Sequence, residues 1–237
     1  MTKQELIEKI AFNVIQGRPS DKYPGVNRKL KGQPGVTELM HMALDQSIDP
    51  KEIMVETLAK PMQEALKKFE TDEFLALDVL LSADCVGIAM DMLDPHLKEA
   101  GINRRSKFVI ATVRGDHHDV GPKVVEVMIK GIGYKTINLG TDVSANRILE
   151  AAINHKVACI GLSALYNRVI GEMEQVINAL EVAGIRSEVK VLIGGGATSA
   201  KFAEQIGADA YCVDAFQAPG VLKRMDNWSG FAGAALN

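Results

Sequence analysis

In the first hundred residues, apolar positions recur at the three- and four-residue spacing of amphipathic helices, and no strand pattern is found. The pattern predicts four helices, at residues 3–15, 36–46, 50–69 and 72–98. Asp49, directly before Pro50, is typical of an N-cap, and Asp72 is expected to cap the last helix. Prolines and glycines between Arg18 and Gly35 predict a long loop. Four helices joined by loops indicate a small bundle.

After Gly101 the period changes, and short β-branched or apolar runs alternate with helical stretches. The predicted strands are residues 107–113, 134–139, 157–162, 189–193 and 210–213. The predicted helices are residues 122–130, 144–153 (capped by Ser144), 169–183, 199–207 and 215–225. This alternation predicts an α/β fold, a five-stranded parallel sheet with helices on both faces. We therefore expect a helical domain at residues 1–100 and an α/β domain at residues 101–237.

Composition narrows the class of protein. The chain has 237 residues, of which 47% are hydrophobic and 24% charged, which excludes a disordered tail, a collagen-like fibre and a coiled-coil rod. Because the net charge is −3 and no basic stripe is found, we expect no nucleic-acid partner. The three cysteines, Cys85, Cys159 and Cys212, form no Cys-x-x-Cys pair, which favours reduced thiols inside a cell.

No segment is typical of export or membrane insertion. The first ten residues have the pattern of an amphipathic helix rather than that of a signal peptide. The most apolar long stretch, Phe74–Leu93, contains Asp78, Asp84 and Asp91, which make bilayer insertion costly. We therefore expect a cytoplasmic protein with no membrane partner.

Candidate chemistry follows three of the predicted strands. The sequence Gly-Asp-His-His-Asp-Val-Gly (115–121) follows the first strand, Ser-Ala-Leu-Tyr-Asn (163–167) the third, and Gly-Gly-Gly-Ala (194–197) the fourth. In open parallel sheets, ligands bind outside the carboxyl ends of the strands, near the point where the strand order reverses. These three loops are therefore expected to form one site.

The motifs Asp-x-His-x-x-Gly, Ser-x-Leu and Gly-Gly, on the first, third and fourth strands, resemble the cobalamin-binding fold. The segment Phe69–Asp84 resembles the cap bundle of corrinoid proteins from bacterial and archaeal methyltransferase systems. The α/β part is similar to the cobalamin-binding domain of methionine synthase. Except for the long Arg18–Gly35 loop, the resemblance covers nearly the whole chain. It implies a four-helix bundle followed by a flavodoxin-like, Rossmann-like sheet.

The resemblance also implies the cofactor and its site. Cobalt accepts imidazole as an axial ligand, and a ligating histidine usually donates its other ring N–H to a carboxylate. His118 is the expected metal ligand and Asp116 its partner, together the reactive pair. In the family this pair displaces the cofactor's dimethylbenzimidazole base (base-off, His-on), and the nucleotide tail enters a slot at the sheet edge. The other residues expected to contact the cofactor are Gly115, His117, Asp119, Val120, Gly121, Ser163, Leu165, Tyr166, Asn167, Gly194, Gly195, Gly196, Ala197, Tyr211, Asp214 and Ala215.

The function that the resemblance implies is that of a methyl carrier. Such a subunit is not a catalyst alone. Its cobalt receives a methyl group from a substrate:corrinoid methyltransferase and passes it to a second methyltransferase with a tetrahydrofolate-type acceptor, and a reductive activase is a further expected partner. Relatives often place Ser or Thr where this chain has Asn167 and Val169, which predicts a shortened proton relay from the Asp–His pair.

Other interpretations of single features stay open. A lone loop histidine is usually a surface residue, and His117 is expected to be the bystander of the pair. The glycines 194–196 are also compatible with a plain strand-to-helix turn or a phosphate loop, although the lysine of a Walker sequence is missing. Ser163 is compatible with a simple helix cap.

Competing functions come from other classes of protein. A zinc or di-metal hydrolase needs more ligands, and the only further histidine of the second half, His155, is expected at the opposite end of the third strand. A cobalamin-dependent regulator or light sensor is the main alternative, with a DNA-binding domain or a tryptophan in the bundle; the only tryptophan here is Trp228. A mutase cofactor subunit and a non-binding scaffold remain as further alternatives.

Overall fold

The structure is a computed structural model that describes residues 1–26, 28–101 and 106–225. Its described residues divide into two compact units. One is formed mainly by residues 1–101 and also includes Lys130–Gly133, and the other is formed by Ser106–Ile129 and residues 134–225. Within the described residues, no helix is both long enough and apolar enough to cross a bilayer.

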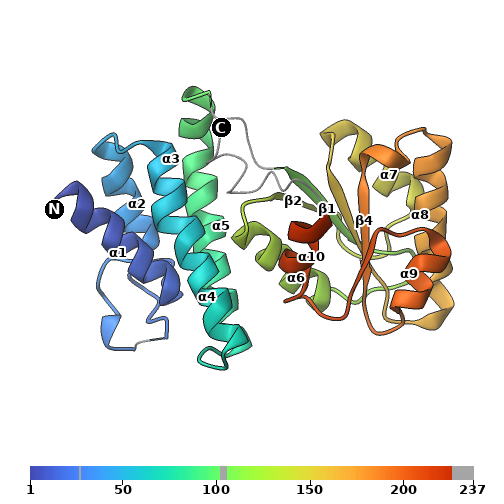
Figure 1. Ribbon diagram of the computed structural model, residues 1–237, viewed down its shortest axis with the longest axis horizontal. Coiled ribbons are helices and arrows are strands. Elements are labelled where there is room, and N and C mark those ends of the chain that lie inside the picture. Colours follow the sequence, from blue (N-terminus) through green and yellow to red (C-terminus); the bar gives the residue numbers. More distant parts are fainter. Residues whose placement is uncertain (27, 102–105, 226–237) are drawn as a thin grey trace. The chain divides into compact units, whose positions relative to one another are not determined.

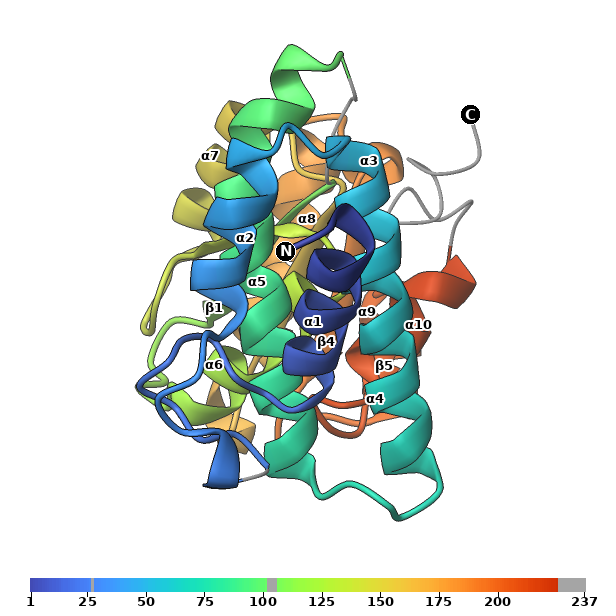
Figure 2. The same ribbon diagram turned by 90° about the vertical axis from the view of Figure 1, so that its left-hand side faces the viewer.

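The first unit contains the four predicted helical segments. They are α1 (Lys3–Ile15), α2 (Val36–Asp45), the run of α3 (Pro50–Glu52), η2 (Ile53–Ala59) and α4 (Lys60–Glu70), and α5 (Ala76–Glu99). Figure 2 shows α1, α2, α4 and α5 of this unit. Their apolar faces meet in a core of fully buried side chains, which supplies the main free energy of folding of this unit. This core includes Leu6, Ile10, Leu39, Met40, Leu58, Val86 and Met90.

The third helical segment contains a π-helical stretch, η2. The backbone N–H of Lys60 donates to the carbonyl of Val55, five residues earlier, and Pro61 follows directly. Because proline has no N–H and its ring crowds the preceding turn, regular α-helical pairing cannot pass through this point, and the wider turn accommodates it.

The start of the last helix differs from the prediction. Asp72 has a positive φ of 59° in the loop before α5 and does not cap it. The helix begins after Leu75, whose backbone N–H donates to the Asp78 carboxylate at 2.8 Å. The sequence Thr-Asp-Glu resembles a cap, but the chain needs those residues to turn out of α4 first. In contrast, the Asp49 cap is confirmed, since its side chain accepts a hydrogen bond from the Lys51 N–H.

The long loop between α1 and α2 is held from inside by Arg18, whose side chain is buried. The guanidinium donates to the carbonyl oxygens of Tyr23, Leu30, Gln33 and Pro34. It also donates to the side chain of Asn13 in α1. The short turn η1 (Arg28–Leu30) is part of this loop. The loop is therefore tied by one side chain to the helix before it.

The second unit is the predicted α/β fold, an all-parallel five-stranded sheet. Its strands are β1 (Lys107–Thr112), β2 (Lys135–Asn138), β3 (Cys159–Ser163), β4 (Lys190–Gly194) and β5 (Ala210–Cys212), in the order β2-β1-β3-β4-β5. The strand order reverses between β1 and β3. Thr112 pairs with Ser163, and Ser163 with Gly194, so the carboxyl ends of these strands are aligned.

Helices cover both faces of this sheet (Figure 1). On one side are α6 (Val120–Gly131) and α10 (Ala218–Met225), and on the other α7 (Ala145–His155), α8 (Gly171–Val182) and α9 (Ala200–Ile206). The last three pack on the inward side chains of β1, β3 and β4 in a dry core that includes Val109, Ile160, Ile193, Ile148 and Val176. The predicted Ser144 cap of α7 is confirmed by its bond from the Arg147 N–H.

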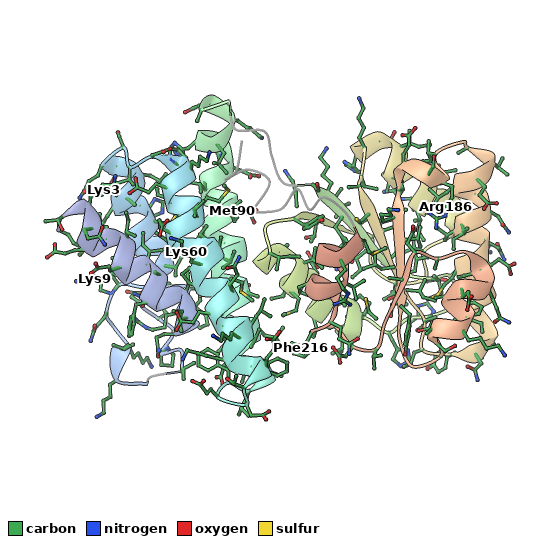
Figure 3. The ribbon with its side chains drawn as sticks, in the orientation of Figure 1. Lys3, Lys9, Lys60, Met90, Arg186 and Phe216 are labelled. Atoms are coloured by element: carbon green, nitrogen blue, oxygen red, sulfur yellow. The ribbon has the colours of Figure 1, made fainter. Side chains whose placement is uncertain are left out.

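The amino end of β4 is fixed by ion pairs. Arg186, labelled in Figure 3, lies in the short turn η4 (Arg186–Glu188) and pairs with Asp209 at 2.7 Å. Asp209 also accepts from Lys190 and from the backbone N–H of Val191. These bonds anchor the edge of the sheet opposite the predicted site.

Candidate functional site

The loop after β1 is organised around the side chain of Asp116, which has no exposed surface. Its Oδ1 accepts from the backbone N–H of His118 at 3.0 Å and lies 2.9 Å from the His118 ring Nδ1. Its Oδ2 accepts from the backbone N–H of Leu165, in the loop after β3, at 2.6 Å. One buried carboxylate therefore joins the loops that follow the two strands at the switch point.

The charge state of Asp116 follows from these contacts. Burial by itself raises the pKa of the carboxyl group, because it removes water from the charged form. The backbone hydrogen bonds from Leu165 and His118 and the contact with the His118 ring outweigh burial and lower the pKa below its ordinary value. Asp116 is thus a carboxylate at neutral pH, able to accept all three bonds.

His118 turns one ring nitrogen to Asp116 and leaves the other available. A carboxylate accepts only, so the contact assigns the proton to Nδ1 and the lone pair to Nε2, which has no hydrogen-bond partner among the described residues. The side chain is 46% exposed. The Tyr166 ring packs edge-on against the imidazole, with centroids 5.0 Å apart, and the Arg168 guanidinium lies over the Tyr166 ring. The imidazole is therefore oriented from two sides.

Two further residues, which the sequence did not single out, hold the backbone of this loop. The buried Thr112 hydroxyl donates to the His118 carbonyl at 2.7 Å. Asp142, in the loop after β2, accepts from the Gly115 N–H at 2.7 Å, and its own N–H donates to the Asp116 carbonyl at 2.9 Å. No motif marks either residue, because their role depends on which strands become neighbours.

A slot of about 240 Å³ opens beside this loop at the carboxyl ends of β1, β3, β4 and β5, next to α6 and α10. Six of the predicted residues line it: Gly121, Ser163, Gly194, Gly195, Asp214 and Ala215. The sequence did not single out the remaining lining, which is Phe108, Ile110, Pro122, Val125, Gly161, Leu162, Leu192, Ile193, Cys212, Val213 and Ala218. Most of these are apolar strand residues, so the slot suits an apolar or flat ligand with few polar ends.

Glycine occupies the positions at and beside the slot for different physical reasons. Gly195 has a φ of +107°, and a Cβ there would lie 2.3 Å from the Ala164 carbonyl oxygen, so the protein itself requires glycine. At Gly196 a Cβ would press on the Leu165 side chain at 3.0 Å. In contrast, a Cβ at Gly121 would meet nothing within 4 Å. Among the glycines that line the slot, Gly121 is the one at which a Cβ would meet no part of the described chain.

Several predicted contacts lie outside the slot. Tyr211 is on the other face of β5, packed against the core under α7, α8 and α9, because neighbouring residues of a strand alternate and Cys212 faces the slot. Tyr211 is therefore not among the residues that line the slot, and its contact with the cofactor stays a prediction. Gly196 and Ala197 turn away toward the β3 loop, where the Ala197 N–H donates to Ala164. Asp214 lines the slot and accepts from the N–H groups of Phe216 and Gln217.

The remaining predicted residues surround His118. His117 and Val120 are exposed, and Asp119 forms an ion pair with Lys123 one turn along α6. Leu165 is 43% exposed, and Asn167 is exposed at the start of the turn η3 (Asn167–Val169). Val169 is buried, close to Gly115, and has no polar side-chain atom to extend the Asp116–His118 pair.

Two features bear on the competing interpretations, a zinc or di-metal site and a light sensor. Among the described residues, no group of three or more His, Cys, Asp or Glu side chains is placed to hold a metal ion. Trp228, which bears on the light-sensor alternative, lies outside the described residues.

Known families match both parts of the chain. Residues 106–220 match a B12 binding domain family, and residues 33–94 match a second B12 binding domain family. A corrinoid protein of Desulfitobacterium hafniense is 32% identical over 179 residues, which are 74% of this chain and 83% of that protein. The chain belongs to the B12-binding corrinoid protein family.

Other corrinoid proteins match over greater length. Dimethylamine corrinoid protein 1 of Methanosarcina acetivorans is 30% identical over 226 residues, 95% of this chain and 99% of that protein. Among solved structures, the methanol:cobalamin methyltransferase complex MtaBC of Methanosarcina barkeri matches with a TM-score of 0.75 and 23% identity, over 100% of this chain and 82% of that chain. A cobalamin-binding protein of D. hafniense DCB-2 matches with a TM-score of 0.65 and 21% identity, over 96% and 100%. These two structures show a shared fold.

Proposed function

We propose that this corrinoid protein is a methyl carrier that works between two partner enzymes. The support is that relatives matched over most of their own length are named as dimethylamine, trimethylamine and monomethylamine corrinoid proteins. When bound, the corrinoid supplies a cobalt ion that accepts and releases the methyl group. The protein by itself is a carrier subunit, and its partners supply substrate recognition.

The corrinoid binds base-off and His-on in this proposal. The observation that carries it is the His118 imidazole, whose Nδ1 is fixed by a buried carboxylate and whose Nε2 has no partner among the described residues. An oriented imidazole nitrogen with an available lone pair is the kind of ligand that cobalt accepts. The adjacent slot has the apolar lining and the open glycine that a displaced, flat base with its tail requires.

The protein's own groups then act on the ligand histidine. Asp116 keeps the Nδ1–H tautomer and balances positive charge on the ring. Tyr166 limits rotation of the imidazole, and Thr112 fixes the backbone that carries it. Val169 is buried and has no hydroxyl group that could hydrogen-bond to Asp116. We therefore infer that the Asp116–His118 pair exchanges its proton with solvent through the exposed part of the His118 ring, and not along a relay of side chains.

The partners in this proposal are a substrate:corrinoid methyltransferase and a second methyltransferase with a tetrahydrofolate-type acceptor. A reductive activase is a further partner in this proposal. Methylamines are the first donors to test, because the named relatives serve them. A cytoplasmic location belongs to the same proposal.

The ligand assignment is tested by electron paramagnetic resonance of the protein loaded with Co(II) cobinamide. This corrinoid has no base of its own to supply a nitrogen ligand. Wild-type protein and His117→Gly should show the splitting from one coordinated nitrogen, and His118→Gly should lose it. If His118→Gly keeps the splitting while His117→Gly loses it, His117 is the ligand. A wild-type protein that stays colourless with every corrinoid would end the proposal.

Methyl transfer is tested separately. The holoprotein is reduced and mixed with the methyltransferase that copurifies with it, and absorption is followed after addition of trimethylamine, dimethylamine, monomethylamine or methanol. The carrier proposal expects a spectral change with one donor, dependent on both proteins. Light-triggered oligomerisation without methyl transfer would favour the sensor alternative.

A further inference from the structure

A second hollow lies on the other side of the first turn of α6 from the slot. This recess, of about 430 Å³, is formed between that turn and the ends of β1 and β2. Its lining is Thr112, Asp119, Pro122, Lys123, Asn138, Leu139, Gly140 and Thr141. Pro122 lines both the slot and the recess. Unlike the slot, the recess is lined mainly by polar residues.

The recess offers hydrogen-bonding groups that the protein does not itself use up. The Thr141 hydroxyl has no partner among the described residues and can both donate and accept. The Asp119–Lys123 ion pair presents an acceptor next to a donor. A Cβ at Gly140 would meet nothing within 4 Å, so the middle of the recess is open. In contrast, both polar ends of Asn138 are occupied, by Glu126 and by the Gly140 N–H.

The recess is joined to the ligand histidine through its floor. Thr112, which lines the recess, donates its hydroxyl hydrogen to the His118 carbonyl at 2.7 Å. Asp119, at the rim, is the residue after His118. A group bound in the recess is therefore held within one turn of chain from the imidazole.

We propose that this recess binds the carboxamide side chains at the edge of the corrin ring, an inference that rests on the proposed function. A corrin ring bound by His118 would lie beside the recess, because Asp119 at its rim is the next residue of the chain, and the rim of such a ring bears primary amides. Each amide has two N–H donors and a carbonyl acceptor, which match the Thr141 hydroxyl and the Asp119–Lys123 pair. The apolar slot cannot satisfy such groups, and leaving them unpaired would weaken binding.

In this proposal the recess and the slot bind different parts of the cofactor. Two corrinoids that differ in the tail can therefore distinguish a change in the recess from a change in the slot. Aquacobinamide has the ring amides without the tail, whereas hydroxocobalamin has both. The Kd of each is measured by absorption for the wild type, Thr141→Val and Thr141→Ser. Thr136→Val is a matched control, because Thr136 lies on β2 outside the recess and its hydroxyl bonds to Glu126. Val125→Phe fills the slot.

Thr141→Val should weaken both corrinoids by about fivefold, the effect of one neutral hydrogen bond. Thr141→Ser, which keeps the hydroxyl, should restore both, and Thr136→Val should change neither by more than about twofold. Val125→Phe should weaken hydroxocobalamin alone. Unchanged binding of both corrinoids by Thr141→Val, or a loss confined to hydroxocobalamin, would overturn the inference. If the wild type binds neither corrinoid, the proposed function itself has failed.

Discussion

Asp116 places a full negative charge inside the protein, next to the loop that carries His118. Three N–H donors reach this carboxylate, two from backbone and one from the imidazole. A buried acceptor with three donors leaves no room for a group that also donates. The side chain therefore fixes the geometry of the loop and the tautomer of the histidine at once.

Asp116→Asn is expected to lower the free energy of unfolding by about 1–3 kcal/mol at neutral pH, because its NH₂ group faces an N–H donor. The pKa of Asp116 is lowered from 3.8, so its stabilising effect is complete above that pH and is lost as the pH falls through the lower folded value. Urea unfolding over a pH series measures this. The gap between wild type and variant should narrow below about pH 4. A gap that widens in acid contradicts the assignment, and Asp45→Asn, at an exposed position on α2, is the control.

Cys212 provides a chemical probe inside the slot. Burial raises the pKa of its thiol to about 11, with the Asp214 carboxylate adding to the shift. Since only the thiolate reacts, alkylation by iodoacetamide should be slow at neutral pH and rise about tenfold per pH unit below that pKa. Mass spectrometry with Cys212→Ser as the blank measures the rate. Hydroxocobalamin should protect the thiol and cobinamide should not; a rate that levels off near neutral pH would contradict the burial argument.

At the scale of elements, two glycines beside the slot have opposite roles. Gly195→Ala should destabilise the fold by more than about 2 kcal/mol, because its φ is positive and a Cβ would strike the Ala164 carbonyl. Gly121→Ala, in the first turn of α6, should leave stability unchanged or higher by about 0.5–1 kcal/mol. The same variant should weaken corrinoid binding.

Thermal unfolding and corrinoid titration of both variants make this comparison. Gly207→Ala is a control for the positive φ, because a Cβ there meets nothing within 4 Å. A Gly195→Ala protein no less stable than Gly207→Ala would show that the close approach to Ala164 costs nothing.

Much of the element order could be predicted from the sequence, and the exceptions have identifiable causes. β-branched runs and caps such as Asp49 and Ser144 act locally, so their elements lie within a few residues of the predicted bounds. Asp72 resembled a cap, but it serves the turn out of α4. The face to which Tyr211 points depends on the phase of a three-residue strand, which no local pattern fixes.

The residues of the site could be predicted from the sequence only where they form a recognisable motif. Asp116 and His118 stand at a recognisable spacing, whereas Asp142 and Thr112 act on them only because β2 and β3 flank β1. The apolar residues of the slot look like ordinary strand residues. Whether such a residue faces the core or a ligand is decided by the arrangement of α6 and α10, not by its type.

For the whole molecule, the chain divides into two compact units, and both the slot and the recess lie in the second. A ligand that binds only the folded form stabilises it by about 2.7 kcal/mol at a concentration of 100 Kd. Hydroxocobalamin should therefore raise the unfolding temperature of the α/β unit in a concentration-dependent way. Circular dichroism and fluorescence of the full chain follow this, with Val125→Phe as the binding-impaired control. A midpoint independent of corrinoid would contradict the placement of the site.

Arg18 has a consequence for how the bundle loses its order. Its guanidinium bonds to four carbonyls of the loop and to Asn13 in the first helix, and its side chain is buried. A surface connection of this length would ordinarily exchange its amide hydrogens quickly. Here the loop can open only by exposing an arginine that the bundle encloses, so its amides should exchange at the rate of α1. In a hydrogen-exchange measurement of Arg18→Met, the amides of the loop should exchange faster than those of α1.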